Sequence, residues 1–167
     1  KRMDSLKEID LKANNVKLKK SSIRRLRNVE ILILVDNDIE ELPSNIDDLK
    51  SIKKLNLAKN KLSDLPPSFG NMLNLEHIIF YKNNFSKIPP LIFKLRNLNE
   101  LDFYYNKIDT VPEEIGNLID LKQLFLSYNE IRYLPSSLME LKQLKYIYMH
   151  HNKLLMLPEW MSEMESL

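Results

Sequence analysis

Apolar residues recur along the whole chain at one fixed spacing. Each copy reads Leu, two residues, Leu, one residue, Leu, two residues, Asn, one residue, Leu, and other apolar residues can stand in for leucine. Six of the seven copies continue with an aliphatic residue and proline, as in Leu65-Pro66. The asparagines follow one another every 23 residues without a gap, at Asn14, Asn37, Asn60, Asn83, Asn106, Asn129 and Asn152. Such regular repetition predicts a solenoid of stacked coils.

The third copy shows what one coil should look like. Leu55 and Leu57 are two residues apart, which predicts a short strand with one buried side. After Asn60 the apolar spacing widens, and Pro66 prevents further strand pairing. We therefore expect residues 66–74 to return along the outside as turns or a short 3₁₀ helix. Stacking would then pair the strands in a parallel sheet, at about 4.8 Å per coil.

The repeated asparagine suits the turn that follows each strand. Its amide group both donates and accepts hydrogen bonds, so it can bond the backbone of its own turn and of the next coil. A buried ladder of amides would satisfy polar groups that the turn leaves unpaired, which is a structural role and not a catalytic one. Gly70 and Gly116, the two glycines, share one position after the proline, and we expect them to be turn residues.

The pattern L-x-x-L-x-L-x-x-N-x-L-x-x-L-P resembles the leucine-rich repeat family over nearly the whole chain. The copy length and phrases such as Val-Pro-Glu-Glu-Ile-Gly-Asn-Leu, residues 111–118, are similar to the intracellular, Ras-group type that includes Scribble-like polarity scaffolds. This resemblance implies an α/β solenoid shaped as a horseshoe, with a parallel sheet on the concave face and turns and short 3₁₀ segments on the convex face. It also implies that the concave sheet binds another protein. We expect one domain, residues 1–167, of seven repeats within a longer array, since Leu167 would open an eighth copy.

Composition narrows the choice of partners only slightly. The net charge of +2 is too balanced to indicate nucleic acid binding, and no apolar run is long enough to span a membrane, so membrane attachment is not expected. The absence of cysteine favours a reducing compartment or a bacterial source, and we expect a cytoplasmic location. A basic run from Lys17 to Arg27 should lie outside the first coil, as a solvated charged face or a site for an acidic partner or anionic lipid.

The strand residues that flank the buried leucines should face solvent on the concave side, where folding does not constrain them. Six of the seven tyrosines fall there or just before the repeated asparagine. Exposed aromatic residues grouped on one face are typical of binding surfaces. The alternative explanation is that tyrosine has a high propensity for β-strands. We expect a protein-binding patch with two acids in it, so that the partner brings Lys or Arg. Its residues are Tyr81, Glu100, Asp102, Tyr104, Phe125, Tyr146, Tyr148 and His150. The residues before the asparagines add Tyr105, Tyr128 and His151 along one rim.

The sequence offers little for catalysis or metal binding. There are three histidines and no cysteine, and His77 lies three coils from His150. Ser127 neighbours His150 by position, but no acid is placed to orient that ring. No phosphate-binding signature is present. We therefore expect no cofactor, no metal, no small-molecule substrate and no enzymatic activity.

Three functions are compatible with this sequence. The first is a protein-interaction module, either a scaffold or an adaptor. The second is a substrate-recruiting part of a larger kinase, GTPase or ubiquitin ligase. The third is a structural subunit of a cytoskeletal or membrane-associated assembly.

Overall fold

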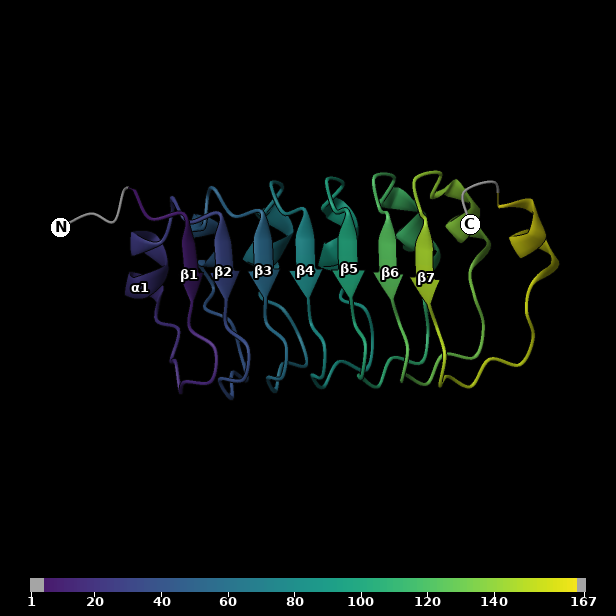
Figure 1. The fold of residues 1–167 in the computed structure, drawn as a ribbon, viewed down its shortest axis with the longest axis horizontal. Helices are drawn as coiled ribbons and strands as arrows, with labels where there is room; N and C mark the ends of the chain where they lie inside the picture. The colour runs from purple at the N-terminus through teal and green to yellow at the C-terminus, as the bar shows by residue number, and fades with distance from the viewer. Residues whose placement is uncertain (1–4, 165–167) are drawn as a thin grey trace.

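Every coil contributes one three-residue strand to a single parallel sheet, and the strands follow chain order (Figure 1). The computed structural model describes residues 5–164. The strands are β1 (Glu8–Asp10), β2 (Ile31–Ile33), β3 (Lys54–Asn56), β4 (His77–Ile79), β5 (Glu100–Asp102), β6 (Gln123–Phe125) and β7 (Tyr146–Tyr148). Behind the sheet run α1 (Lys20–Arg25) and the 3₁₀ helices η1 (Ile46–Asp48), η2 (Pro67–Asn71), η3 (Pro90–Lys94), η4 (Glu113–Asn117), η5 (Ser136–Glu140) and η6 (Glu159–Glu163). The predicted solenoid is confirmed.

The sheet register follows the repeat interval. Leu55 pairs with Ile78, its equivalent 23 residues further on, and the same shift relates every neighbouring pair of strands. Equivalent apolar residues therefore lie above one another, and those of the inner coils are almost fully buried. Phe80 lies at the centre of an aromatic group in this core, with ring centroids 4.9 Å from Phe85 and 5.0 Å from Phe103.

The predicted amide ladder is present. In the third coil, Asn60 Nδ2 donates to the carbonyls of Leu34 (2.8 Å) and Leu57 (2.9 Å), and its Oδ1 accepts the N–H of Ile39 (2.9 Å). These bonds link two coils, and equivalent bonds recur at Asn83, Asn106, Asn129 and Asn152. The amide satisfies buried backbone groups that the turn would otherwise leave unpaired.

The convex side departs from the regular pattern in the first coil. The other copies have proline before a 3₁₀ helix, whereas here Lys19 precedes the six-residue helix α1, which begins at Lys20. Its Arg24 and Arg25 are exposed, so the basic run lies outside the coil as expected. Among the described residues, no helix has the length and apolar character needed to cross a membrane.

The two glycines do not need their conformational freedom. Both lie in 3₁₀ helices, and neither has a positive φ. A Cβ atom added at Gly116 would approach the Cβ and carbonyl oxygen of Ser137 to 2.9 Å, while one at Gly70 would meet nothing closer than 3.4 Å. Gly116 is therefore required by close packing between coils, and not by a turn.

The last coil leaves apolar side chains uncovered. Leu157 is 70% exposed, whereas its counterparts in the inner coils, such as Leu134 and Val111, are buried. Leu155 is 65% exposed, at a position where the inner coils have polar residues such as Arg132 and Asp109. Trp160 is half-buried against the core. Leu167, the expected start of an eighth copy, lies outside the described residues.

Candidate functional site

The residues predicted to form the binding patch do lie together on the sheet. Glu100 and Tyr146 flank Gln123 in one row across β5, β6 and β7, and Asp102, Phe125 and Tyr148 form the next row. Tyr81, Tyr104 and His150 follow the strand ends and join through ring contacts. Tyr146, Tyr148 and His150 are exposed, and the other five residues of the patch are half-buried. The structure tests their position, and their role in binding stays a prediction.

Three aromatic rings close over a small buried residue at the ends of β5 to β7. Ser127 lies between Tyr104 and His150 in its row and is completely buried. The rings of Tyr104 and His150, two coils apart, come within 5.6 Å of each other, and Tyr128 lies 5.3 Å from both. The Ser127 hydroxyl has no hydrogen-bond partner beneath this group. A small side chain in the middle coil thus allows its neighbours to meet.

A second column of rings extends the cluster along the rim of the sheet. Tyr105 stacks on Tyr128 at 4.4 Å, and Tyr128 stacks on His151 at 4.2 Å. Sequence reasoning placed these three residues on the rim but left them out of the patch. Ring contacts connect them to Tyr81, Tyr104 and His150, and we call the six connected residues the aromatic ridge. They are Tyr81, Tyr104, Tyr105, Tyr128, His150 and His151.

The three ridge residues of the second column occupy an unfavourable backbone conformation. Tyr105, Tyr128 and His151 have φ values of 60°, 55° and 54°, in the left-handed region that bulky residues rarely adopt. The equivalent residues of the other coils share this conformation: Ala13, Asp36, Lys59 and Lys82. Because residues as different as alanine, aspartate, lysine and tyrosine adopt it there, the coil architecture imposes it, and backbone preference does not explain the aromatic residues.

Not every strand-flanking position faces solvent as predicted. Ala58, Ile79 and Ser127 are buried, with exposed fractions of 6%, 8% and 0%. Each is small or lies beside larger side chains of neighbouring coils, which cover it. Exposure at these positions therefore depends on the neighbours as well as on strand alternation.

The two acids of the patch differ in their surroundings. Glu100 Oε2 lies 2.9 Å from Nδ1 of His77, which is one coil away. Asp102 has Ile79 and Phe125 as its neighbours across the sheet, and its Oδ1 accepts the Tyr104 N–H at 2.7 Å. Burial raises the pKa of Asp102 to about 7, and the nearby Glu100 charge adds to this effect. Asp102 is thus a carboxyl group in largely apolar surroundings.

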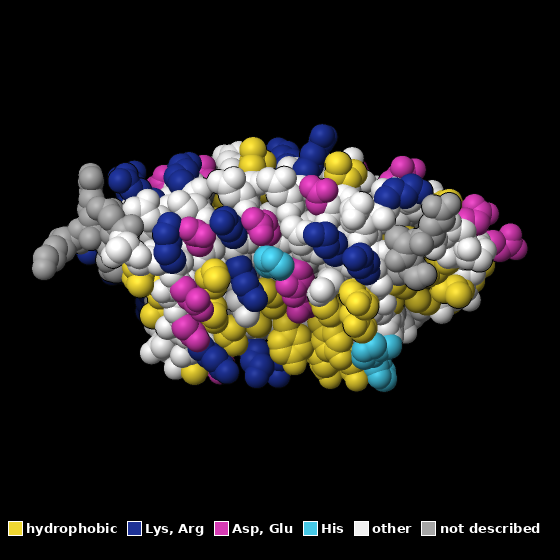
Figure 2. Space-filling model, turned by 45° about the horizontal axis from the view of Figure 1, so that its top comes forward, with side chains coloured by type: hydrophobic (Ala, Val, Ile, Leu, Met, Phe, Trp, Pro, Cys, Tyr) yellow, Lys and Arg dark blue, Asp and Glu magenta, His cyan; other side chains and the backbone are white. Residues whose placement is uncertain are grey.

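The surface around the ridge carries mixed charges. In Figure 2 hydrophobic side chains gather on the lower part of the view, bordered by histidines at one end and by lysine and arginine side chains at the other.

Burial raises the pKa of the Tyr104 hydroxyl, and the neighbouring tyrosines act in the same direction. Phe125 and Tyr148, the Phe125–Tyr148 pair, stack almost parallel at 4.9 Å and 3° beside the ridge. The aromatic surface therefore extends from the strand ends onto the sheet itself.

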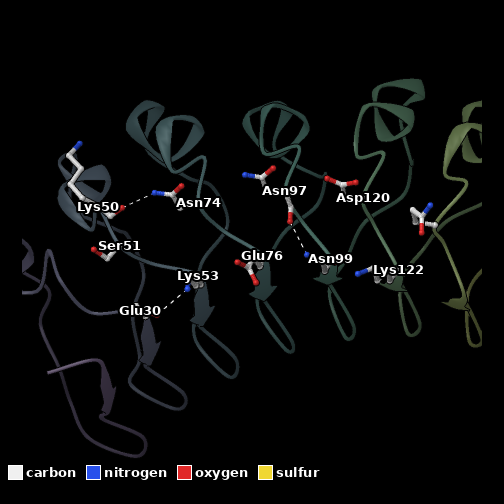
Figure 3. Close-up of a pocket in the computed structure, with 11 residues that line it drawn as sticks. Glu30, Lys50, Ser51, Lys53, Asn74, Glu76, Asn97, Asn99, Asp120 and Lys122 are labelled. Carbon is white, nitrogen blue, oxygen red and sulfur yellow. Dashed lines mark hydrogen bonds and ion pairs between the residues drawn. The ribbon is translucent and has the colours of Figure 1, made fainter. Parts of the chain in front are cut away.

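A shallow polar trough of about 690 Å³ runs along the opposite edge of the sheet, where the strands begin (Figure 3). Its side chains largely bond one coil to the next: Asn74 Nδ2 donates to the Lys50 carbonyl at 2.9 Å, and Lys53 pairs with Glu30 at 3.2 Å. Lys7 also bonds Glu30, and both lysines hold the pKa of that carboxyl below its usual value. These contacts account for the trough as part of the stacking between coils. No group of three or more His, Asp or Glu residues that could hold a metal occurs in residues 5–164.

Comparison with known proteins supports the assignment of the chain as a leucine-rich repeat solenoid. A family model described as a leucine-rich repeat region matches residues 92–167, and a second, described as a leucine rich repeat, matches residues 51–72. A comparison with curated proteins found no match.

Solved structures resemble the chain over almost its full length. A leucine-rich repeat protein from Leptospira interrogans shares 33% sequence identity and a TM-score of 0.93, over 98% of this chain and 42% of its own. An internalin from Listeria monocytogenes, at 19% identity and a TM-score of 0.85, covers 98% of this chain and 47% of its own. The repeat ectodomain of a receptor kinase from Arabidopsis thaliana, in complex with CASPARIAN STRIP INTEGRITY FACTOR 2, shares 30% identity and a TM-score of 0.79, over 92% of this chain and 19% of its own.

The chain thus spans less than half the length of each of these three proteins. The repeat pattern, the seven-stranded parallel sheet and both family models agree. The chain belongs to the leucine-rich repeat proteins.

Proposed function

We propose that this chain is a non-enzymatic protein-binding module, of scaffold or adaptor type, and that its partner docks on the aromatic ridge and the Phe125–Tyr148 pair. Aromatic side chains supply large contact areas at a small entropic cost, and tyrosine is enriched among residues that dominate binding energy. In this chain such residues gather on one face, and they are not needed to bury the core.

The observation that carries the proposal is the clustering of Tyr105, Tyr128 and His151 with the other rings of the ridge. The left-handed backbone at this position costs of order 1–3 kcal/mol for any residue other than glycine, and it recurs in all seven coils. Other coils place alanine, aspartate or lysine at the equivalent position, so the fold does not require an aromatic ring. A contact outside the chain gives a physical reason for this grouping.

Protein neighbours of similar fold give independent support. The Arabidopsis ectodomain was solved with a bound protein factor, so a related stack of coils can hold a polypeptide. For the present chain, docking on the ridge is our inference from the arrangement of its own side chains.

The proposal can be tested by affinity capture with two matched variants. One replaces Tyr104, Phe125 and Tyr148 by alanine on the sheet face. The control replaces Leu73, Ile119 and Tyr133, which are 55%, 54% and 61% exposed but lie off the strands. We expect the sheet-face variant to lose proteins that the wild type and the control both retain.

A captured partner is then titrated against single variants. Tyr148→Ala should weaken binding by about 1–3 kcal/mol, as expected for an aromatic contact residue. Thermal unfolding should change little, because Tyr148 is 42% exposed. Equal capture by the wild type and the sheet-face variant would contradict the proposal.

A further inference from the structure

Three residues in one row of the sheet make the same local hydrogen bond. Asp10, Asn56 and Asp102 are equivalent by repeat position, and the Oδ1 of each accepts the backbone N–H two residues further on. The distances are 2.8 Å, 3.0 Å and 2.7 Å. Because the amide of Asn56 makes this bond as well as a carboxylate does, the bond needs no charge, and Ile33, Ile79 and Phe125 show that the fold does not require the bond in every coil.

Asp102 differs from the other two in what surrounds it. Asp10 is exposed, whereas Asp102 lies between the buried Ile79 and the ring of Phe125. Keeping a charge in such surroundings costs free energy unless an opposite charge is close. The ion pairs found in residues 5–164 do not involve Asp102, while Glu100 already has His77 at 2.9 Å.

Aromatic rings border Asp102 on two sides. The Phe125–Tyr148 pair lies across the sheet, and Tyr104, which belongs to the ridge, follows two residues later in the chain. Ring faces attract cations, and long basic side chains also carry an apolar stem that packs well on rings. An acid with aromatic walls is thus suited to a cation on a hydrocarbon chain.

We propose that Asp102 receives one Arg or Lys side chain of a partner protein, with the stem of that side chain against Phe125 and Tyr104. This inference rests on the proposed docking at the ridge, and it assigns the electrostatic contact to Asp102 and not to Glu100. The incoming cation would supply the opposite charge that Asp102 lacks within the described chain.

Binding of a cation should couple to the ionisation of Asp102. Its pKa of about 7 means that part of the population is neutral near pH 6.5. A cation favours the ionised form, so binding should release a proton at that pH and tighten between pH 6 and pH 8.

β6 presents no charged group to Asp102. The titratable groups near it on β4 and β5 and just beyond them are His77, Tyr81, Glu100 and Tyr104.

The probe for the experiment is a displayed library of random twelve-residue peptides, selected on the wild-type protein. Peptides are kept only if the Tyr104, Phe125 and Tyr148 alanine variant fails to bind them. We expect Arg or Lys to be enriched at one position of these peptides. Replacing that residue by alanine should weaken binding about tenfold or more, as should Asp102→Asn.

Two controls make the result specific. Asp10→Asn changes the same position in an exposed setting and should leave peptide affinity unchanged. Asp102→Asn in combination with the alanine-substituted peptide should weaken binding no further than either change alone, because both remove one contact. Calorimetry in two buffers of different ionisation enthalpy should detect proton release near pH 6.5, and His77→Gln should retain that release.

The possible failures are distinguishable. Ridge-dependent peptides without a basic residue, or with equal affinity for Asp102→Asn, would overturn the assignment to Asp102 while leaving docking at the ridge intact. A selection in which no peptide depends on the ridge would overturn both proposals.

Discussion

Asp102 should make the protein less stable as the pH rises, and replacing it by asparagine should remove this effect. An unfolded aspartate has a pKa of about 3.9, whereas burial raises the pKa of Asp102 to about 7. Between these values the folded protein holds a proton that the unfolded chain has lost. The free energy of unfolding therefore falls as the pH rises from about 4 to about 7, and the contribution of Asp102 is constant above that range.

The size of the effect follows from the difference in pKa. The folded and unfolded pKa values of Asp102 differ by about three, and a difference of one corresponds to about 1.4 kcal/mol. The loss in free energy of unfolding at pH 8 is therefore at most about 4 kcal/mol. Asp102 is half-buried, so water screens part of the cost, and we take about 2 kcal/mol as the lower end. Asparagine should keep the hydrogen bond to the Tyr104 N–H, as Asn56 does in its own coil.

Urea unfolding of the wild type and Asp102→Asn at pH 4.5, 6, 7 and 8 measures this difference. The variant should be more stable than the wild type by no more than about 1 kcal/mol at pH 4.5 and by about 2–4 kcal/mol at pH 8. Other titrating groups are common to both proteins and cancel in the difference. Asp10→Asn should show no such gap, because Asp10 is exposed. A variant no more stable than the wild type at pH 8 would refute the assignment of a half-buried, unpaired charge to Asp102.

Three further substitutions test the packing of the coils. Asn60→Ala should lower the free energy of unfolding by about 1–3 kcal/mol in urea titration, because buried carbonyls and N–H groups lose their partner, while Asn14→Ala in the exposed first turn should cost less. Gly116→Ala should lower the free energy of unfolding by about 1–3 kcal/mol through overpacking, whereas Gly70→Ala should be tolerated. Similar melting temperatures for the two variants would contradict the packing role of Gly116. Ser127→Ala should leave the protein as stable or raise its unfolding free energy by about 1 kcal/mol, since its buried hydroxyl has no partner, and a clear loss of stability would show an undetected bond.

The repeat interval was sufficient to predict the sheet and the amide ladder. Parallel coils of equal length must place Leu55 beside Ile78, and a turn asparagine in each coil must then stand above the next. The helix in the first coil was not predicted, because the missing proline removes a constraint without stating which helix replaces the 3₁₀ turn. The intracellular type and the cytoplasmic location stay predictions.

The candidate site was only partly predictable. Strand alternation correctly placed Phe125 and Tyr148 on the same face, because backbone geometry fixes that side. Strand alternation wrongly predicted that Ile79 and Ser127 are exposed, because their burial depends on the size and tilt of side chains in neighbouring coils. The extent of the ridge was underestimated for the same reason. The contact between the rings of Tyr104 and His150 depends on the small residue between them, and no single repeat contains that information.

The row of left-handed residues has a consequence for how this surface can change over evolutionary time. Its backbone angles are set by the surrounding coil, and residues as different as Ala13, Lys59 and Tyr105 already adopt them. A mutation there alters what the rim displays without altering the path of the main chain. Descendants of this gene, or variants made in the laboratory, could therefore acquire new ligands by exchanging these side chains one coil at a time.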